Sequence, residues 1–361
     1  MLALLAAAEP EWNFDCIAYA ATARAWLGES SPTRHARVYA DLAAIAPTKV
    51  QVDIGQGSEY RRSIAADHRK LTAQLPFYAN KPLYIGLVAL QVAFGINSIA
   101  ATFIVSALAY GLLAVAFLGC WTRITDRPLV WVVAGCVLLA PPIREVGQLA
   151  TPDALAAALA FVGLSLLALR ERFVLGTGLM LASILARPDS VLLVLAVLVW
   201  SAWSKRADRR TIVMAASASV ATLVVMSSAI PTYPWATLVH HTFVAPMADP
   251  RSASVSVQPL RYLTILGRGL RGDFVLHRSF APLFLVLTIG AWIWPTRETR
   301  PSPHLRLQAV LWAAISLHFL AFPMLADRFF VAHYLGMVVL TVSAGRSPGR
   351  SGANEGSLQS S

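Results

Sequence analysis

Charged residues are scarce in this chain, and acidic residues are scarcer than basic ones. Only 14% of the 361 residues are charged, while 57% are hydrophobic and the mean hydropathy is +0.59. This balance lies far above that of soluble proteins and indicates a polytopic membrane protein. The three cysteines, Cys16, Cys120 and Cys136, lack the spacing of metal ligands, so neither a zinc site nor a disulfide framework is expected.

The excess of basic residues does not indicate nucleic acid. The chain has 30 Lys and Arg residues against 19 Asp and Glu residues, a formal net charge of +11. These basic residues cluster between apolar runs instead of forming one basic face. Positive loops against anionic membrane lipids explain the charge better, and no nucleic-acid partner is expected.

Long apolar segments predict an all-α bundle of about nine to ten transmembrane helices. A helix needs about 20 mostly apolar residues to cross the hydrocarbon core of a bilayer. The expected crossings are 98–121, 129–148, 152–169, 173–186, 188–204, 211–230, 280–295, 307–325 and 329–345. The apolar segment 82–96 is shorter, and we expect a juxtamembrane or re-entrant helix there.

Basic residues lie in every second loop of this arrangement. By the positive-inside rule these loops are cytoplasmic, and the chain is expected to be a multi-pass membrane protein. The cytoplasmic residues are then Arg123, Arg127, Arg170, Arg172, Lys205, Arg206, Arg209, Arg210, Arg297, Arg300, Arg306, Arg346 and Arg350. The candidate chemistry therefore lies on the outer face, in 142–152, 187–189, 231–279, 326–328 and the first polar region.

The chain divides into four parts on this interpretation. Residues 1–8 are apolar, too short to span, and lack the features of a signal peptide, so we expect a remnant of a first transmembrane helix. A genuine start followed by a loop inserted after translation is the alternative. An outer, periplasmic loop with juxtamembrane helices at 9–97 and a bundle at 98–345 follow, with a disordered cytoplasmic tail at 346–361.

Two clusters in the first outer loop carry candidate functional groups. Asp15, Tyr19, Thr22 and Trp26 recur at helical spacing, which predicts one face of an interfacial helix with a carboxylate at its start. An Asp there also simply favours a helix N-terminus. In the second cluster, Lys81 precedes Pro82 and Tyr84 at the start of an apolar helix. Its ammonium suits a lipid phosphate, although a snorkelling lysine would look the same.

Three arginines lie on the outer side, where positive charge is unusual. An ionisable group at membrane depth needs a partner. The arginines are Arg144, Arg187 and Arg328, and the nearby carboxylates are Glu145, Asp153, Asp189 and Asp327. Structural ion pairs explain this pattern, and so does phosphate binding by a planar guanidinium group.

The outer loop 231–279 contains adjacent histidines among aromatic residues. His240 and His241 point to different faces of a helix, so they are not expected to ligate one metal together. One of them could pair with a carboxylate of the first loop as a metal ligand or proton carrier. The alternative is a hydrogen bond at the membrane interface.

Several segments together resemble the GT-C glycosyltransferases, in particular the bacterial aminoarabinose-transferase and protein-mannosyltransferase-like branch. The resemblance covers most of residues 10–205. It is carried by WNFDCIAYA, NKPLYIGLVALQVAFGIN, TPDALAAALAFVGLSLLAL and GLMLASILARPDSVLLVL. The order of these degenerate motifs carries more weight than any one of them.

This resemblance implies a multi-pass protein of a bacterial inner membrane that transfers a sugar from a polyprenyl-phosphate donor to a lipid, cell-wall glycan or protein acceptor. Asp15 matches the acidic residue that acts as general base, and Lys81 matches the position that holds the donor phosphate. Asn80 and Ala18 depart from the family pattern, so a divalent metal stays an open question. From position alone, Arg187 and Arg144 are added as donor phosphate-binding residues. The candidate substrate-binding residues are Tyr19, Tyr84, Asp153, Asp189, His240, His241 and Arg328.

Two other classes of protein remain open. Broken helices at Pro141-Pro142 and at 187–189 are typical of transporters or flippases. The sequence shows no convincing internal repeat, however, and transporters usually have one. A GT-C-like scaffold subunit without catalysis is the third alternative.

Overall fold

The computed structural model describes residues 1–124, 128–169, 172–252, 255–275, 279–293 and 303–344. The predicted all-α class is confirmed for these residues, which form helices joined by short connections and contain no strand. An isolated parallel bridge joins Glu11 and Leu149. The expected tail at 346–361 lies outside the described residues.

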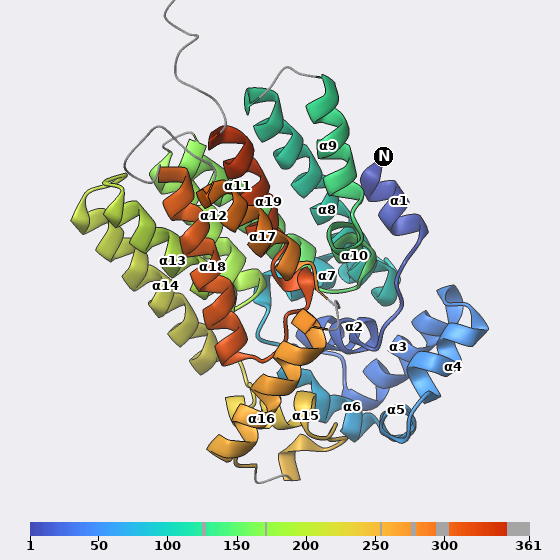
Figure 1. Ribbon diagram of the computed structural model, residues 1–361. Helices are drawn as coiled ribbons and strands as arrows, with labels where there is room; N and C mark the ends of the chain where they lie inside the picture. The colour runs from blue at the N-terminus through green and yellow to red at the C-terminus, as the bar shows by residue number, and fades with distance from the viewer. Residues whose placement is uncertain (125–127, 170–171, 253–254, 276–278, 294–302, 345–361) are drawn as a thin grey trace, which may run out of the picture.

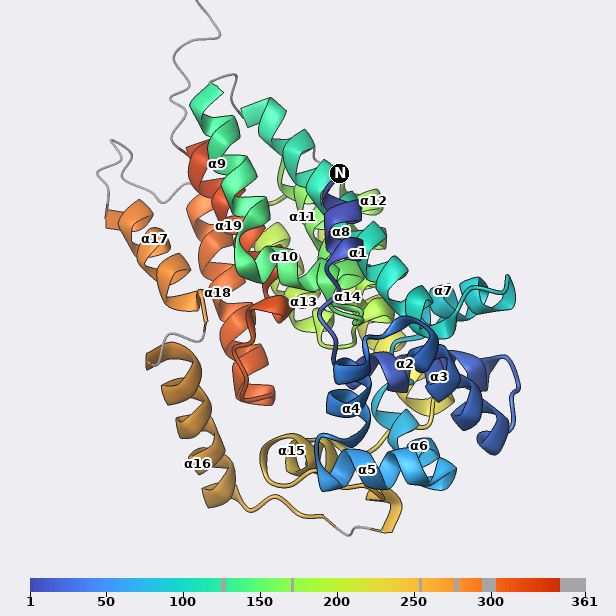
Figure 2. The same ribbon diagram turned by 90° about the vertical axis from the view of Figure 1, so that its right-hand side faces the viewer.

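The helices form a bundle and a smaller polar lobe beneath it (Figures 1 and 2). The bundle contains α8 (Ser98–Ile124), α9 (Pro128–Leu139), α10 (Pro141–Gln148), α11 (Asp153–Leu169), α12 (Phe173–Ala186), α13 (Ser190–Trp203), α14 (Arg209–Ala229), α17 (Ala281–Ile293), α18 (Pro303–Ala321) and α19 (Val331–Ala344). The lobe contains α2 (Asp15–Trp26), α3 (Ser31–Ile45), α4 (Thr48–Gln56), α5 (Glu59–Ala66), α6 (His68–Gln74) and α15 (Trp235–Phe243). The helix α16 (Pro259–Gly269) lies apart from α2–α6, below α17, and contacts α15 and the end of α18 (Figure 2).

Short elements connect these two parts. The helix α1 (Leu2–Ala8) packs against α8 and α10, where the Cβ atom of Ala3 faces Gly111. The remaining elements are η1 (Leu75–Phe77), α7 (Pro82–Ala93), η2 (Pro250–Ser252), the π-helical turn η3 (Leu270–Val275) and η4 (Asp327–Phe329). The first polar region and the first part of the loop 231–279, which are far apart in sequence, therefore form one lobe.

Most predicted apolar segments match a helix, but the crossing expected at 129–148 is wrong. Here the structure has two helices, α9 and α10, that meet at Ala140. Ala140 has an extended conformation, with φ −57° and ψ 139°. A residue before proline is disfavoured in the α-region, so Pro141 and Pro142 end one helix and start the next.

Two described helices, α8 and α14, are long and apolar enough to cross a membrane. Only 17% of the most apolar part of α14 is buried, against 56% for α8. The other apolar helices are shorter, with 10–17 residues, and they include α7, α11, α12, α13 and α19. Length and composition thus support two crossings among the described residues, and the total of nine to ten crossings stays a prediction.

The helix α2 differs from the one-sided interfacial helix that the spacing predicts. Every residue from Cys16 to Arg24 is buried, including Tyr19 and Thr22, because α3, α7 and α8 pack around the helix. Trp26 alone of the expected face is exposed. Alanines at most other positions permit close packing on all sides of α2. The spacing of its larger side chains does not indicate this.

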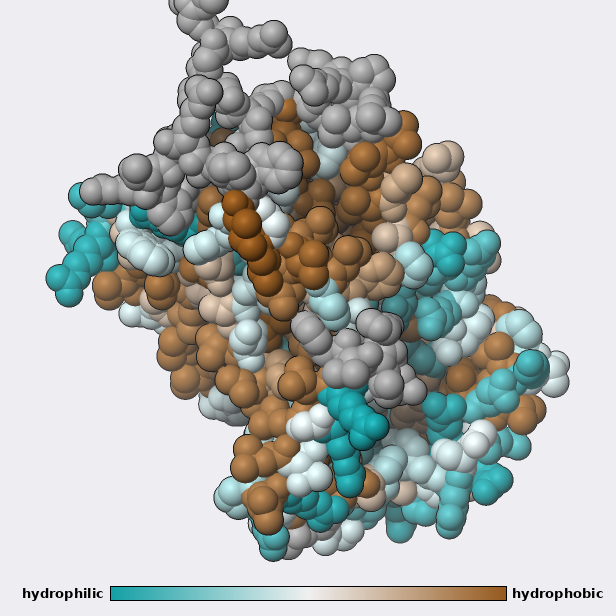
Figure 3. Space-filling view, viewed as in Figure 1, coloured by the Kyte–Doolittle hydropathy of each residue, from teal (hydrophilic) through white to brown (hydrophobic). Residues whose placement is uncertain are grey.

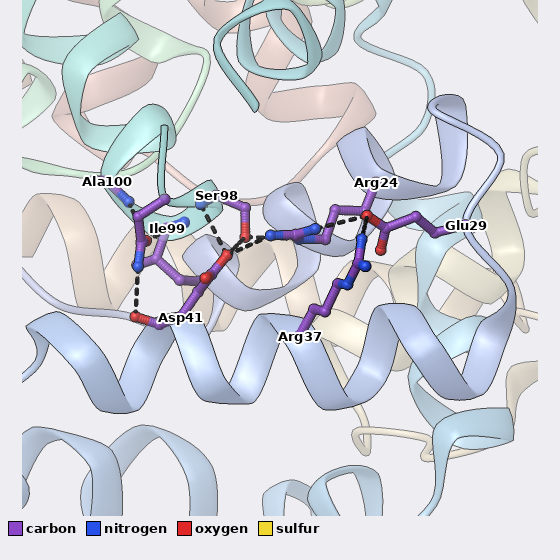
Figure 4. Close-up of polar contacts among 8 residues, drawn as sticks. Arg24, Glu29, Arg37, Asp41, Ser98, Ile99 and Ala100 are labelled. Atoms are coloured by element: carbon purple, nitrogen blue, oxygen red, sulfur yellow. Dashed lines mark hydrogen bonds and ion pairs between the residues drawn. The ribbon is translucent and has the colours of Figure 1, made fainter. Parts of the chain in front are cut away.

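Arg24 ties α2 to α3 and to the start of α8 (Figure 4). Its guanidinium donates to Glu29 and Asp41, both at 2.7 Å, and to Ser98 Oγ at 3.1 Å. Asp41 also accepts from the backbone N–H of Ser98 at 2.9 Å. A carboxylate at this end of α8 neutralises the arginine and satisfies a free N–H of the helix. The network fixes the position of the polar lobe beneath the bundle.

Two glycines allow α11 and α12 to pack closely. A Cβ atom added to Gly163 would lie 2.7 Å from the backbone oxygen of Gly176, and one added to Gly176 would lie 2.8 Å from that of Gly163. Small residues at such contacts let helix backbones approach, which is the common way helices associate in lipid. This contact holds together the two helices whose ends carry Asp153 and Arg187.

Replacing Gly163 by Ala is expected to lower the free energy of unfolding by about 1–3 kcal/mol, because the methyl group must push α12 away. Gly178→Ala on α12 is the matched control, since no atom lies within 4 Å of its added Cβ. Thermal unfolding of the purified variants in detergent measures both effects. Equal stability of the two variants would contradict the close approach.

Candidate functional site

Asp15 is the first residue of α2 and lies against Tyr78. The Tyr78 hydroxyl donates to Asp15 Oδ1 at 3.1 Å, and this is the one side-chain hydrogen bond of Asp15 among the described residues. Tyr19, one turn along α2, contacts the rings of Tyr78 and Tyr84 edge-on, with centroids 5.0 Å apart in both cases. The carboxylate therefore has a fixed orientation at the edge of an aromatic cluster.

Lys81 lies over the same aromatic cluster. Its Nζ atom is 5.6 Å from the ring centroid of Tyr19 and 5.7 Å from that of Tyr78. It donates to the Phe77 carbonyl at 3.0 Å and to Asn80 Oδ1 at 2.9 Å, which are both uncharged. No carboxylate in the described chain lies within salt-bridge distance of Nζ. Burial lowers the pKa of Lys81 to about 8, with a further contribution from the positive charge of Arg187.

Arg187 occupies the break between α12 and α13 and contacts two carboxylates. Its guanidinium donates to Asp189 and to Asp153, and it lies 4.2 Å from the ring centroid of Phe329. His318 Nε2 is 2.8 Å from Asp189 Oδ2. The charge of Arg187 is thus already neutralised by protein groups, as the ion-pair interpretation of the sequence predicts.

Arg328 adds a second guanidinium to this cluster. Its Nε atom is 3.5 Å from Asp153 Oδ2, beyond hydrogen-bond distance, and Thr151 Oγ1 donates to the same oxygen at 2.8 Å. A cavity of about 30 Å³ lies among Asp153, Arg187, Arg328 and the neighbouring histidines. A volume of this size holds no more than one or two water molecules. The cluster is consequently a packed ionic network and not an open substrate pocket.

The two groups of residues are electrostatic neighbours. Asp15 and Asp153 both raise the pKa of the buried Tyr19 phenol, and Arg187 lowers it, while burial is the largest cause of its raised pKa. After burial, the positive charge of Arg187 contributes most to lowering the pKa of Lys81, while the negative charges of Asp189 and Asp15 raise it. The structure therefore brings the candidates of the first loop close to those of the central helices, although 72 positions separate Lys81 from Asp153 in sequence.

Three other residues that stand out in the sequence are held by contacts of their own. The side chain of Arg144 is 49% exposed and lies 4.0 Å from the carboxylate of Glu9, so its ion-pair contact is with Glu9 and not with the adjacent Glu145. Tyr84 is buried and its hydroxyl donates to the Thr102 carbonyl at 3.0 Å, so it anchors α7 to α8. Asp327 accepts hydrogen bonds from Ser279 and Tyr334.

The two histidines of the outer loop lie in the polar lobe. His241 packs against Phe77 and Tyr60, and its Nδ1 atom accepts from the Met247 N–H at 3.0 Å. Burial lowers the pKa of His241 to about 4, so the ring is neutral at ordinary pH. His240 Nδ1 has no hydrogen-bond partner in the described chain. Of the two alternatives for these histidines, pairing with a first-loop carboxylate is not seen among the described residues, where aromatic packing and a backbone hydrogen bond hold His241.

Sequence reasoning missed His318 and underrated Tyr78. His318 lies within a long apolar run, and an ionisable residue at such a position is a signal for a buried polar contact. Tyr78 lies in the same short cluster as Lys81, but nothing in the sequence indicates its contact with Asp15 across 63 residues. Both residues become visible only when the helices are packed.

The described residues contain no group of three His, Cys, Asp or Glu side chains that could hold a metal ion. Asp153 and Asp189 both contact the guanidinium group of Arg187, and Asp189 also contacts His318. Basic side chains of the protein therefore occupy the carboxylates of this cluster.

Comparison with protein-family models, curated proteins and solved structures gave no match. The resemblance to GT-C enzymes therefore depends on the sequence segments alone. Function must be argued from the geometry of Asp15, Lys81 and their neighbours.

Proposed function

We propose that the bundle lies in a membrane, with the polar lobe on its outer side. Large apolar side chains are exposed along the bundle helices, and Figure 3 shows them as extended hydrophobic areas above a more hydrophilic lobe. Examples are Leu108, Leu112 and Val115 on α8, Val220, Val224 and Val225 on α14, and Leu283, Val286 and Leu287 on α17. Exposed apolar area of this extent is stable against lipid and not against water. The basic loops support this orientation, and the resemblance to a bacterial branch of GT-C enzymes supports a bacterial inner membrane.

We propose that the protein is a glycosyltransferase that moves a sugar from a polyprenyl-phosphate donor to a lipid, glycan or protein acceptor. The observation that carries this proposal is a fixed carboxylate, Asp15, beside Lys81, an ammonium group with no anionic partner among the described residues. A partly buried cation without a counterion is a site for an anion such as a phosphate. A carboxylate nearby supplies a base for the acceptor hydroxyl.

The reaction assigns a role to each group. Asp15 accepts the proton of the acceptor hydroxyl as the oxygen forms a bond to the anomeric carbon of the sugar. The bond between that carbon and the donor phosphate oxygen breaks, and polyprenyl phosphate leaves with the electron pair. Lys81 stabilises the negative charge that develops on the leaving phosphate. Tyr78 holds the carboxylate in position through its hydrogen bond.

In this proposal Arg187 holds the ends of the central helices in place and does not bind phosphate, because its guanidinium group already pairs with Asp153 and Asp189. Arg328, whose Nε atom has no hydrogen-bond partner among the described residues, extends this packed network toward Asp153. The same buried cluster favours a transporter as the second candidate function. Ionisable groups at broken helices within a bundle are typical of carriers, and the breaks at Ala140 and at 187–189 are both present.

Reconstitution into liposomes separates the two functions. The purified protein is given a radiolabelled polyprenyl-phosphate sugar together with a membrane glycan extract. Transfer predicts labelled product and release of polyprenyl phosphate, while a carrier predicts movement of labelled donor between leaflets with no covalent change. Flux without product would refute the glycosyltransferase proposal.

The transfer reaction is expected to lose efficiency above pH 8. The pKa of Lys81 is lowered to about 8, so the ammonium form that binds phosphate decreases as the pH rises through this value. We expect kcat/KM to fall about tenfold per pH unit above it. Lys81→Arg should keep its efficiency to higher pH, because a guanidinium stays protonated. A Lys81→Met variant with an unchanged pH profile would contradict the role of Lys81.

A further inference from the structure

The polar lobe contains an open cleft that the proposed reaction does not use. It has a volume of about 440 Å³ and lies where α6 meets α3 and the turn η2 of the outer loop. Its lining residues are Ser31, Asp67, His68, Arg69, Lys70, Thr72, Ala73, Asp249 and Arg251. Ala73 is the single apolar member of this set. The cleft therefore suits a hydrated, polar ligand and offers no wall for a prenyl or acyl chain.

The cleft carries an excess of positive charge. Arg69, Lys70 and Arg251 line it, together with the carboxylates of Asp67 and Asp249. Asp67 Oδ1 accepts from the backbone N–H of Arg69 at 2.8 Å, and Asp249 Oδ1 accepts from the backbone N–H of Arg251 at 3.2 Å, so both carboxylates keep their negative charge. Three cationic side chains against two carboxylates leave the lining with an excess of one positive charge.

A buried arginine lies directly behind the cleft. Arg34 is 6% exposed, and its contacts in the described chain are uncharged oxygens, the Glu29 carbonyl at 3.1 Å and Thr72 Oγ1 at 2.8 Å. Its Nε atom has no hydrogen-bond partner among the described residues. Burial lowers the pKa of Arg34, and the negative charge of Glu29 offsets part of this effect.

Hydroxyl groups connect Arg34 to the cleft. Thr72, which accepts from Arg34, is 2.6 Å from Ser31 Oγ, and Ser31 Oγ is 2.9 Å from His68 Nδ1. All three of these residues line the cleft. An anion placed against them would receive hydrogen bonds and the field of the buried guanidinium together, which is a stronger arrangement than surface lysines alone.

The cleft also has a defined position relative to Asp15. Thr72 on α6 and Tyr78 after η1 are six residues apart along a nearly continuous helical segment. Helical rise places them roughly 9 Å from each other along the axis. Tyr78 donates a hydrogen bond to Asp15, so this helical segment links the cleft to the carboxylate.

We propose that this cleft binds the negatively charged group of a saccharide. The binding site stands on its own geometry, and its role as the acceptor subsite depends on the glycosyltransferase function proposed above. The acceptor would then be a sugar carrying a phosphate or a carboxylate, held by Arg69, Arg251 and the Thr72 network while its hydroxyl meets Asp15.

Isothermal titration of the full chain in neutral detergent tests this proposal with glucose 6-phosphate, glucuronate and glucose as probes. We expect both charged sugars to bind at least tenfold more tightly than glucose, and the difference to shrink with added salt. The double variant Arg69→Gln/Arg251→Gln should lose the preference, since both side chains are exposed and their loss leaves the core unchanged. Arg261→Gln, an exposed arginine on α16 in the same outer loop, is the matched control and should retain it.

Asp15→Asn separates the two proposals. It should bind the charged sugars as the wild type does, while transfer is lost. If the wild type binds charged sugars but transfers nothing, the anion site holds and its acceptor role fails with the proposed function. Equal binding of charged and neutral sugars, or an undiminished preference in the double variant, would overturn the site itself.

Discussion

Replacing Asp15 by Asn is expected to lower the rate of sugar transfer by roughly a hundred- to ten-thousandfold, the range contributed by a positioned general base. The amide keeps the size of the side chain and can still accept the hydrogen bond from Tyr78, so the fold should not change. It cannot accept the proton of the acceptor hydroxyl. Initial rates of product formation in liposomes, at saturating donor, measure the loss.

Asp53→Asn is the matched control for this variant. Asp53 is an exposed carboxylate on α4 in the same lobe, and its replacement is expected to leave the rate of transfer unchanged. Tyr78→Phe tests the orientation of the base, because it removes the hydrogen bond and keeps the ring that packs on Tyr19. An Asp15→Asn variant that transfers sugar within a few-fold of the wild-type rate would remove Asp15 from the chemistry.

The helices of the bundle could largely be predicted from apolar runs, because a segment surrounded by lipid or by other apolar helices needs few polar residues. The boundary at Ala140 could have been predicted as well, since two prolines follow it. The interior position of α2 could not. Its alanine-rich sequence packs on all sides, and an apparent pattern in its larger side chains predicts a face that does not exist.

The site shows the same division between local and long-range information. Asp15 and Lys81 stand out in sequence because a charge beside an apolar run is unusual. The Arg24 network and the basic cleft do not stand out, because their members are ordinary polar residues of a loop until α2, α3 and α6 are packed together. Contacts across long stretches of chain, such as Gln74 to Met247, decide which charges remain without a partner.

Arg187 is expected to stabilise the protein more than any other single arginine of the outer side. Replacing it by Met should cost about 3–5 kcal/mol of unfolding free energy, the range for breaking a buried ion pair. The loss leaves the buried Asp153 and the half-buried Asp189 with Arg328 and His318 as their remaining partners, at poorer geometry for Asp153. Thermal unfolding in detergent, with the wild type alongside, measures this loss.

Two comparisons separate a structural Arg187 from one that holds the donor phosphate. Arg144→Met removes a half-exposed arginine 4.0 Å from Glu9 and should cost less than about 1 kcal/mol, as surface pairs do. Adding Asp153→Asn and Asp189→Asn to Arg187→Met removes the uncompensated charges and should restore much of the stability, because a buried carboxylate without its cation is the source of the cost. An Arg187→Met variant that unfolds like the wild type but no longer binds donor would instead assign this guanidinium to the phosphate.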